Sequence, residues 1–203
     1  MAFINLRARE IQIKIVYYGP AHSGKTANLR RIYALYRNSL QSRLLTVAAG
    51  DERTLFLDFM TFTVPRVNGF DLKVRIYTVP GHEHCAEIRK TVLKGADGIV
   101  FVADLSAMRK TNIMSLIDLR SNLRALGKDL ARIPLVFQFN KCDLADHGTL
   151  LLPAATLLSD LNREYRRPYF VASAAKGRNV VSTLKKIIAT TMDAVEKRYR
   201  EVS

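Results

Sequence analysis

The sequence reads Gly19-Pro20-Ala21-His22-Ser23-Gly24-Lys25-Thr26 and fits the pattern G-x-x-x-x-G-K-[ST] at every position. An apolar run, Ile11 to Tyr18, precedes it, and a helix-like run, Ala27 to Tyr36, follows it. A strand, a glycine-rich loop and a helix in this order are typical of a phosphate-binding loop. The glycines let backbone N–H groups turn towards phosphate oxygens, and the helix start adds the positive end of a dipole. The stretch therefore predicts a nucleotide site, with a chance glycine-rich turn as the alternative.

The loop predicts specific contacts with a bound nucleotide. Lys25 is long enough to reach the β- and γ-phosphates, and the hydroxyl of Thr26 is expected to hold Mg²⁺. We expect His22 to be exposed, because the loop backbone would bind the phosphates. The residues expected at the nucleotide are Gly19, Ala21, His22, Ser23, Gly24, Lys25, Thr26 and Ala27.

The length and composition of the chain suit one globular domain. With 203 residues, 48% of them hydrophobic, we expect residues 1–203 to form a single domain with a full core. No apolar stretch approaches the roughly 18 residues of a membrane span. The chain start lacks a signal-peptide layout, Ala2 stands where N-myristoylation needs glycine, and no prenylation cysteine ends the chain. Cys85 and Cys142 do not suggest a disulfide scaffold, so we expect a cytoplasmic protein.

The chain is strongly basic. Its 32 Lys and Arg residues against 18 Asp and Glu give a net charge of +14, which favours anionic partners. The charges are dispersed rather than gathered in blocks, so we expect mainly a solvated basic surface. A weak, reversible contact with an anionic membrane surface is the minority hypothesis. Nucleic acid is not expected, since no basic motif interleaved with aromatic residues occurs. Without a partner, we expect a monomer.

Apolar runs alternate with amphipathic runs along the chain, which is typical of an α/β fold with a largely parallel sheet. Residues 98–103 and 135–139 are almost continuously apolar, as strands buried on both faces should be. Asn68-Gly69 between the second and third strands is a hairpin signal, so we expect that pair to be antiparallel. The expected strands are 11–18, 54–64, 72–79, 98–103, 135–140 and 169–172, and the expected helices are 25–36, 86–94, 111–126, 154–163 and 180–196.

A second motif, Asn140-Lys141-Cys142-Asp143, follows a buried apolar run and indicates the base. The Asp143 carboxylate can accept hydrogen bonds from both N1–H and the 2-amino group of guanine, a donor arrangement that adenine lacks. Lys141 can lay its aliphatic stem over the purine. After the final strand, Ser173-Ala174-Ala175-Lys176 resembles the S-A-K loop whose alanine N–H contacts guanine O6, with an ordinary strand–helix turn as the alternative.

Together these motifs resemble the Ras-like small GTPases, and most closely their MglA-type bacterial branch. The resemblance covers most of the chain and is strongest before residue 145. It implies an α/β P-loop NTPase of the small G-domain type, which is a three-layer sandwich with a mostly parallel six-stranded sheet and one antiparallel edge hairpin strand. It also implies binding of GTP or GDP and Mg²⁺. It rests on Phe3-Ile4-Asn5, Lys14 to Pro20, Arg53 to Phe56, Asp58-Phe59, Tyr77 to Gly81, Leu93 to Gly95, Val100 to Asp104 and Asn140-Lys141.

The resemblance assigns roles to residues in two switch segments, which order around the γ-phosphate and Mg²⁺ and relax after hydrolysis. Thr54 matches the threonine that contacts Mg²⁺ and the γ-phosphate. Arg53 matches the arginine that the MglA branch supplies in cis to neutralise charge on the transferring phosphoryl group, with an exposed loop charge as the alternative. Gly81 matches the glycine whose N–H contacts the γ-phosphate.

Three residues depart from the usual Ras pattern. Thr78 replaces the carboxylate that holds Mg²⁺ through water, as it also does in the MglA branch. Ala21 stands where many Ras-like proteins have glycine, and its methyl group predicts crowding and slow hydrolysis. His82 replaces the glutamine that orients the attacking water, so either the imidazole positions water or it faces solvent and hydrolysis is feeble. A metal site at His82, His84 and Cys85 is disfavoured, because no second ligand cluster is present in the sequence.

Two functional hypotheses follow. The first is a small GTPase that cycles between GDP and GTP, hydrolyses GTP slowly and is stimulated by a Roadblock-type partner similar to MglB; family members of this kind act in cell polarity and motility. The second is a guanine-nucleotide-binding module that is deficient in hydrolysis and serves as a scaffold. A P-loop kinase or ATPase is a third class, and Asp143 argues against it.

Overall fold

A twisted sheet forms the centre of the structure, a computed structural model that describes residues 2–37, 45–48, 56–67, 69–81 and 85–202. In these residues, the sheet has eight strands: seven are joined in the order β3-β4-β5-β2-β6-β7-β8, and β1 pairs with β2 beside this path. The strands are β1 (Phe3–Asn5), β2 (Glu10–Tyr18), β3 (Leu45–Ala48), β4 (Phe56–Val67), β5 (Phe70–Thr78), β6 (Gly98–Asp104), β7 (Leu135–Asn140) and β8 (Tyr169–Val171).

The strands pair mostly in parallel. β2 lies parallel between β5 and β6, and β7 lies parallel between β6 and β8. β4 is antiparallel to β5, with Val67 opposite Phe70 at the turn, which confirms the predicted hairpin. Parallel strands need crossover connections, and the helices between them supply these connections.

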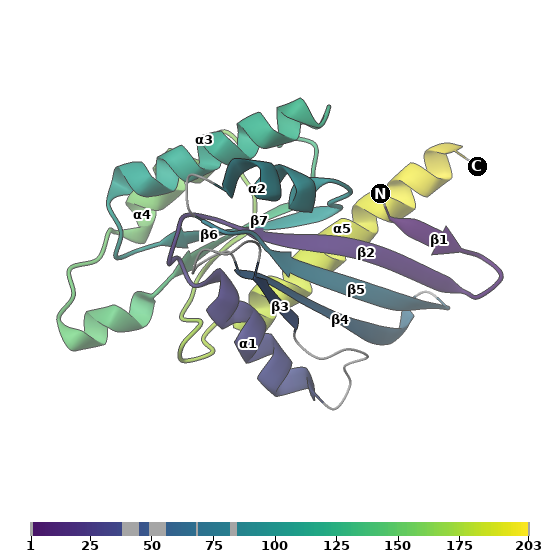
Figure 1. The fold of residues 1–203 in the computed structure, drawn as a ribbon, viewed down its shortest axis with the longest axis horizontal. Coiled ribbons are helices and arrows are strands. Elements are labelled where there is room, and N and C mark those ends of the chain that lie inside the picture. The colour runs from purple at the N-terminus through teal and green to yellow at the C-terminus, as the bar shows by residue number, and fades with distance from the viewer. Residues whose placement is uncertain (1, 38–44, 49–55, 68, 82–84, 203) are drawn as a thin grey trace.

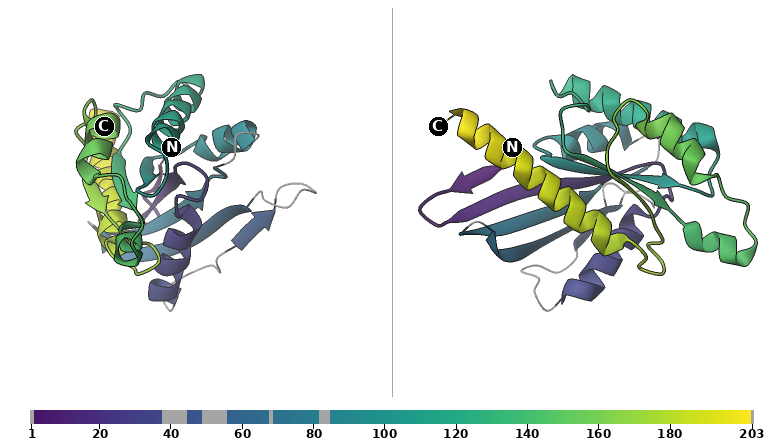
Figure 2. Two further views of the ribbon diagram at one scale, coloured as in Figure 1. Left: turned by 90° about the vertical axis from the view of Figure 1, so that its left-hand side faces the viewer. Right: turned by 180° about the vertical axis from the view of Figure 1, so that it is seen from behind.

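Helices cover both faces of the sheet and complete a three-layer sandwich (Figures 1 and 2). Leu29 of α1 and Leu184 of α5 pack in one core, and Val92 of α2, Leu119 of α3 and Leu157 of α4 pack in the other. The predicted α/β class is confirmed. The helices are α1 (Lys25–Tyr36), α2 (Ala86–Leu93), α3 (Arg109–Ala125), the 3₁₀ helix η3 (Cys142–His147), α4 (Ala154–Leu157), the π-helical η4 (Leu158–Asn162) and α5 (Val180–Val202).

Alternate residues of the central strands enter opposite cores. Val100 and Val102 of β6 pack on the side of α1 and α5, whereas Ile99 and Phe101 pack on the side of α2 and α3. All seven residues of β6 are buried. This two-sided burial explains why the strand reads as a continuous apolar run rather than an alternating one.

Two details of the predicted fold need correction. The described sheet has eight strands rather than six, because β1 pairs antiparallel with β2 and β3 pairs antiparallel with β4. β3, not β4, is therefore the outermost strand on that side. Both extra strands are only three or four residues long, too short for an alternating pattern to be recognised. The helix expected over 154–163 is α-helical only as far as Leu157 and continues as η4.

The parallel pairing determines where the site residues meet. The carboxyl ends of β2, β5, β6, β7 and β8 all lie at one edge of the sheet, because these five strands run in the same direction. In open α/β sheets, ligands bind outside this edge. The opposite edge carries the starts of the same strands, together with the turn between β1 and β2.

Candidate nucleotide-binding site

The phosphate loop follows β2 directly and leads into α1. Gly24 is the N-terminal cap of α1 with φ +94°, and Gly19 has φ +149°. A Cβ at Gly24 would lie 2.1 Å from Nδ2 of Asn140, and a Cβ at Gly19 would lie 2.2 Å from the carbonyl oxygen of Val102. Both glycines are therefore required by backbone conformation and by close neighbours. The loop is held against the ends of β6 and β7.

Lys25 is buried inside the loop that it follows. Its Nζ donates to the carbonyl oxygens of Gly19 at 2.9 Å and Pro20 at 2.6 Å. Burial lowers the pKa of Lys25 to about 7; the positive charge of Arg89 adds to this shift, and Asp104 opposes it. A phosphate group beside Nζ would favour the charged form again. The loop thus holds a cation whose environment suits an anionic ligand.

Other loop residues fit a phosphate cradle. Ser23 is fully buried, and its Oγ has no hydrogen-bond partner among the described residues. Thr26 is half-buried in the first turn of α1, and Ala27 follows it. His22 is exposed with φ +59°, as the sequence predicts. An unpartnered buried hydroxyl and a glycine-lined turn fit a phosphate ligand, with the Thr26 hydroxyl available for Mg²⁺.

Asn140, the last residue of β7, joins two loops. Its Nδ2 donates to the carbonyl oxygen of Ser23 at 2.7 Å, and its Oδ1 accepts the N–H of Ala174 at 2.8 Å. The side chain is almost completely buried. Asn140 therefore connects the phosphate loop to the loop after β8. The structure brings these motifs together from separate parts of the sequence.

Lys141 and Asp143 lie where a base would reach them. Lys141 adopts φ +72°, and its Nζ lies 2.6 Å from Oδ2 of Asp104. Asp143 is half-buried in the first turn of η3, and no described residue forms a hydrogen bond or ion pair with its carboxylate. Sequence reasoning missed Asp104, whose other carboxylate oxygen accepts from Ser106 N–H and Oγ. Its position at the end of a buried strand is the only signal in the sequence that could have indicated it.

The loop after β8 is held by its own hydrogen bonds. Ser173 is buried, and its Oγ accepts the N–H of Lys176 at 3.0 Å. Ala174 is buried, and its N–H donates to Asn140, whereas Ala175 is exposed. The N–H of Ala174 is thus bonded within the protein.

The segment after β5 touches the phosphate loop. A Cβ on Gly81 would lie 2.3 Å from the backbone nitrogen of Ala21 and 2.7 Å from the carbonyl carbon of Pro20. Thr78 is buried at the end of β5, and the N–H of Val79 donates to Tyr17 at 3.3 Å. The predicted second switch therefore begins in direct backbone contact with the loop. Arg53, Thr54 and His82 lie outside the described residues, so their roles stay predictions.

A hollow of about 670 Å³ adjoins this contact and is lined by α2, α3, Ala21 and Gly81. In its wall, the guanidinium of Arg89 forms an ion pair with Asp118 at 2.9 Å. The Tyr18 hydroxyl donates to the same carboxylate. Sequence reasoning missed Arg89, since nothing in the spacing marks a buried arginine on an amphipathic helix. The pair ties the helix after the second switch to α3.

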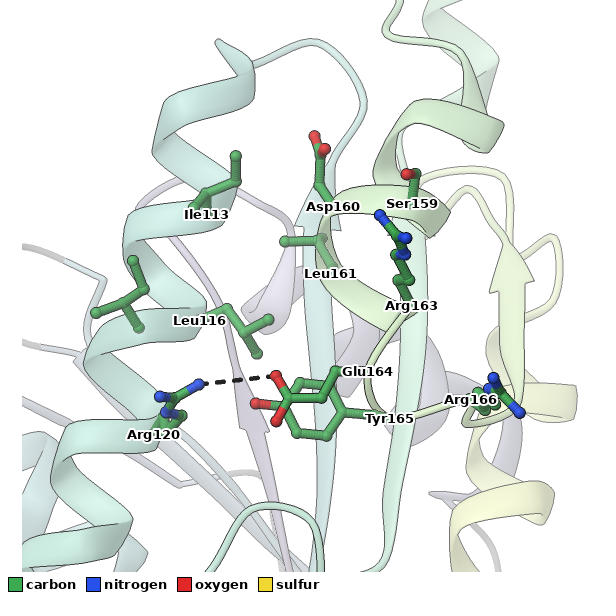
Figure 3. Close-up of a pocket in the computed structure, with 11 residues that line it drawn as sticks. Ile113, Leu116, Arg120, Ser159, Asp160, Leu161, Arg163, Glu164, Tyr165 and Arg166 are labelled. Carbon is green, nitrogen blue, oxygen red and sulfur yellow. Dashed lines mark ion pairs between the residues drawn. The ribbon is translucent and has the colours of Figure 1, made fainter.

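A second hollow of about 490 Å³ lies between α3 and η4, away from the loop (Figure 3). Arg120 and Glu164, which form an ion pair at 3.7 Å, line it together with Leu116 and Tyr165. None of the predicted site residues lines it. Among the described residues, no three His, Cys, Asp or Glu side chains converge as a metal site; His82 and His84 fall outside them.

The sheet, the loop and the base-side motifs together define a P-loop nucleotide-binding fold. Residues 14–193 match the model of the Ras family. The chain is 38% identical over 201 residues to the mutual gliding-motility protein MglA of Myxococcus xanthus, covering 97% of this chain and 99% of that protein. It is also 26% identical over 195 residues to Ras-related protein Rab-27B of Rattus norvegicus (93% of this chain, 82% of that protein) and 28% identical over 157 residues to GTP-binding protein YPTM1 of Zea mays (73% and 71%).

The chain therefore belongs to the Ras family, as an MglA-type Ras-like small GTPase. This confirms the family that the sequence motifs predict. Ras-family GTPases bind GTP and GDP and hydrolyse GTP.

Proposed function

We propose that this protein is a molecular switch that hydrolyses GTP slowly and is stimulated by a Roadblock-type partner similar to MglB. The observation that carries the proposal is the backbone contact between Gly81 and Ala21. A γ-phosphate bound by the loop would reach the same place, so its presence or loss would act on the position of the second switch segment. In this way the nucleotide would control the surface that a partner meets.

The residues of the site divide into a phosphate side and a base side. On the phosphate side, loop N–H groups and Lys25 would hold the phosphates, and the hydroxyls of Thr26 and Thr54 would hold Mg²⁺. Bound Mg²⁺ supplies charge neutralisation between the β- and γ-phosphates. On the base side, Asp143 would accept the two guanine N–H groups, with Lys141 positioned over the purine by its ion pair with Asp104.

Slow hydrolysis is supported by the surroundings of the γ-phosphate position. The backbone of Ala21, which carries a methyl group where many Ras-like proteins have glycine, stands next to Gly81. The buried Thr78 offers a hydroxyl where other Ras-like proteins have a carboxylate. Arg53 would supply positive charge to the transferring phosphoryl group, and His82 would orient the attacking water. A Roadblock-type partner would act by fixing the positions of these two side chains.

Single-turnover GTP hydrolysis by the wild type, Arg53→Ala and His82→Ala tests these roles. With a Roadblock-type protein added, we expect the wild-type rate to rise. The stimulated rates of both variants should be at least about a hundredfold lower than that of the wild type. The tightness of GDP binding should stay unchanged, which controls for folding. Equal rates in all three proteins would remove both assignments.

A second candidate is a guanine-nucleotide-binding module without useful hydrolysis. The crowding of Gly81 against Ala21 and the missing carboxylate at Thr78 favour it. Phosphate release that stays at the uncatalysed level, with and without Roadblock-type proteins, would support this candidate over the switch.

We further propose a single-domain, cytoplasmic monomer that acts in cell motility or polarity and makes a weak contact with an anionic membrane surface. The similarity to a gliding-motility protein supports the process. No helix in the described part of the chain has the length and apolar character to cross a bilayer. An excess of 14 positive charges supports the proposed membrane contact.

A further inference from the structure

The end of the molecule opposite the nucleotide site gathers positive charge. The turn between β1 and β2, the residues before β6 and β7, and the last turns of α5 lie at this end, on the right of Figure 1 and on the left of the second panel of Figure 2. Asp97, just before β6, donates its N–H to Lys14 of β2 at 2.8 Å. We call this surface the basic end; its cations are Arg7, Arg9, Lys14, Lys94, Lys128, Arg132, Lys197, Arg198 and Arg200.

A hollow of about 630 Å³ opens in the basic end between the loop before β7 and α5. Four of the cations line it: Lys128, Arg132, Lys197 and Arg198. The hollow is large enough to admit a phosphate headgroup, and the cations reach it from two separate elements. It is therefore a concave surface with a converging positive field.

Acidic residues neutralise this surface only in part. Asp97 is 3% exposed, and its Oδ2 accepts the N–H of Lys14 at 2.9 Å, so its charge is directed into the protein. Asp129 accepts the N–H of Ala131 within its own turn. Glu201 is the remaining acid that lines the hollow. Glu10 and Asp71 lie at the starts of β2 and β5, and Glu10 forms an ion pair with Lys73 at 2.5 Å. The nine cations of the basic end outnumber these acids.

The cations are close enough to repel one another. Burial is the main cause that lowers the pKa of Lys128, with Arg198 adding to the shift and Asp97 opposing it. Burial likewise lowers the pKa of Lys14, opposed by Asp97 and assisted by Lys128 and Arg75. Both amino groups are anchored, Lys128 on the carbonyl oxygen of Ala96 and Lys14 on that of Lys94. An anion in the hollow would relieve this repulsion without rearranging the side chains.

Exposed apolar side chains accompany the cations. Leu6 is 58% exposed in the turn between β1 and β2, where Arg7 and Arg9 follow it. Tyr199 is 45% exposed between Arg198 and Arg200 on the last turns of α5. A soluble phosphate would use only the charges, whereas a lipid surface also accommodates apolar and aromatic side chains in its headgroup layer. The combination favours a membrane.

We propose that the basic end binds the phosphate headgroups of an anionic phospholipid membrane, with Leu6 and Tyr199 in the headgroup layer. This assignment rests on the membrane contact proposed above and gives it a location. Because the nucleotide site lies at the other edge of the sheet, the loop and the second switch face away from the membrane. A bound protein therefore keeps its nucleotide site open to partners, and membrane binding is independent of GTP hydrolysis.

Vesicle sedimentation of the full chain tests the proposal. The probes are vesicles of phosphatidylcholine alone and vesicles that also contain phosphatidylglycerol, at physiological salt. We expect binding to the anionic vesicles only, and a drop of about thirtyfold in partitioning when two charges are removed in Lys197→Gln/Arg198→Gln. Leu6→Ser should weaken vesicle binding further. The matched control is Lys185→Gln/Lys186→Gln, which removes two exposed charges from the same helix outside the basic end.

The outcomes separate this proposal from its rivals. Equal loss in the control and test variants would show a net-charge effect and overturn the location. Inorganic phosphate that releases the protein at millimolar concentration, or duplex DNA that binds the basic end more tightly than vesicles do, would overturn the lipid assignment. GTP hydrolysis is measured on the same variants and should not change, so a failed switch and a failed membrane site are distinguishable.

Discussion

At the residue scale, Lys25 should make nucleotide affinity depend on pH. Its pKa is lowered to about 7 without nucleotide, and a bound phosphate raises it, so binding takes up a proton above pH 7. Protonation of Lys25 should therefore leave GDP affinity independent of pH below pH 7. Above pH 7, it should make GDP affinity fall by up to about tenfold for each pH unit. The measurement is GDP affinity against pH for the wild type and Lys25→Met. If the ratio of the GDP affinities of the wild type and Lys25→Met stays constant above pH 7, the prediction is wrong.

Gly24 should not tolerate a side chain. A methyl group there would lie 2.1 Å from Asn140 Nδ2, on a backbone with φ +94°. We expect Gly24→Ala to lower the free energy of unfolding by about 1–3 kcal/mol in urea titrations. Part of this cost comes from the clash, so it should shrink in an Asn140→Ala background. Equal costs in both backgrounds would show that the contact with Asn140 does not matter.

At the element scale, the contact between the second switch and the phosphate loop should be sensitive to a single methyl group. Gly81→Ala would place a Cβ 2.3 Å from the backbone nitrogen of Ala21, and backbone atoms cannot move aside cheaply. We expect GDP binding to persist and single-turnover GTP hydrolysis to fall at least about tenfold, because one γ-phosphate donor is displaced.

Ala21→Gly serves as the comparison for this variant. It removes the methyl group that is predicted to crowd the γ-phosphate and leaves the backbone atoms in place, so hydrolysis should rise in Ala21→Gly alone. It should not rescue Gly81→Ala, since the clash there is with the loop backbone. Rescue in the double variant would mean that the side chain of Ala21 is the obstacle instead.

The elements differ in how well the sequence predicts them. The loops at the nucleotide site follow from motifs at strand ends, because parallel pairing brings those ends to one edge. The short strands β1 and β3 could not be predicted, since three or four residues carry no periodic signal. The ion pairs of Asp104 and Arg89 could not be predicted either, because their partners Lys141 and Asp118 come from distant parts of the chain.

At the scale of the whole molecule, nucleotide binding should stabilise the fold. The site joins loops after five parallel strands, and Asn140 connects two of them directly. GDP at a concentration of a hundred times its Kd should raise the free energy of unfolding by about 2.7 kcal/mol above that of the nucleotide-free protein. Denaturant titrations with GDP, with ADP and without nucleotide measure this difference. A stabilisation by ADP as large as that by GDP would contradict base recognition by Asp143.

The proposed nucleotide site and the proposed membrane site lie at two separate ends of the molecule. The nucleotide site occupies the carboxyl edge of the parallel strands, and the basic end occupies the opposite edge. The chain has a net charge of +14. Because the two ends are separate, a nucleotide bound at one edge does not cover the cations at the other. Charge changes at the basic end should therefore leave the nucleotide site unaffected.

Recognition of guanine at this site is what a GTP switch requires before anything else. The most direct test is competition of GTP and ATP against a fluorescent GDP analogue bound to the full chain with Mg²⁺. GTP should compete at least about ten-thousandfold more effectively than ATP, and Asp143→Ala should largely remove this preference. Comparable competition by ATP and GTP in the wild type would contradict the claim.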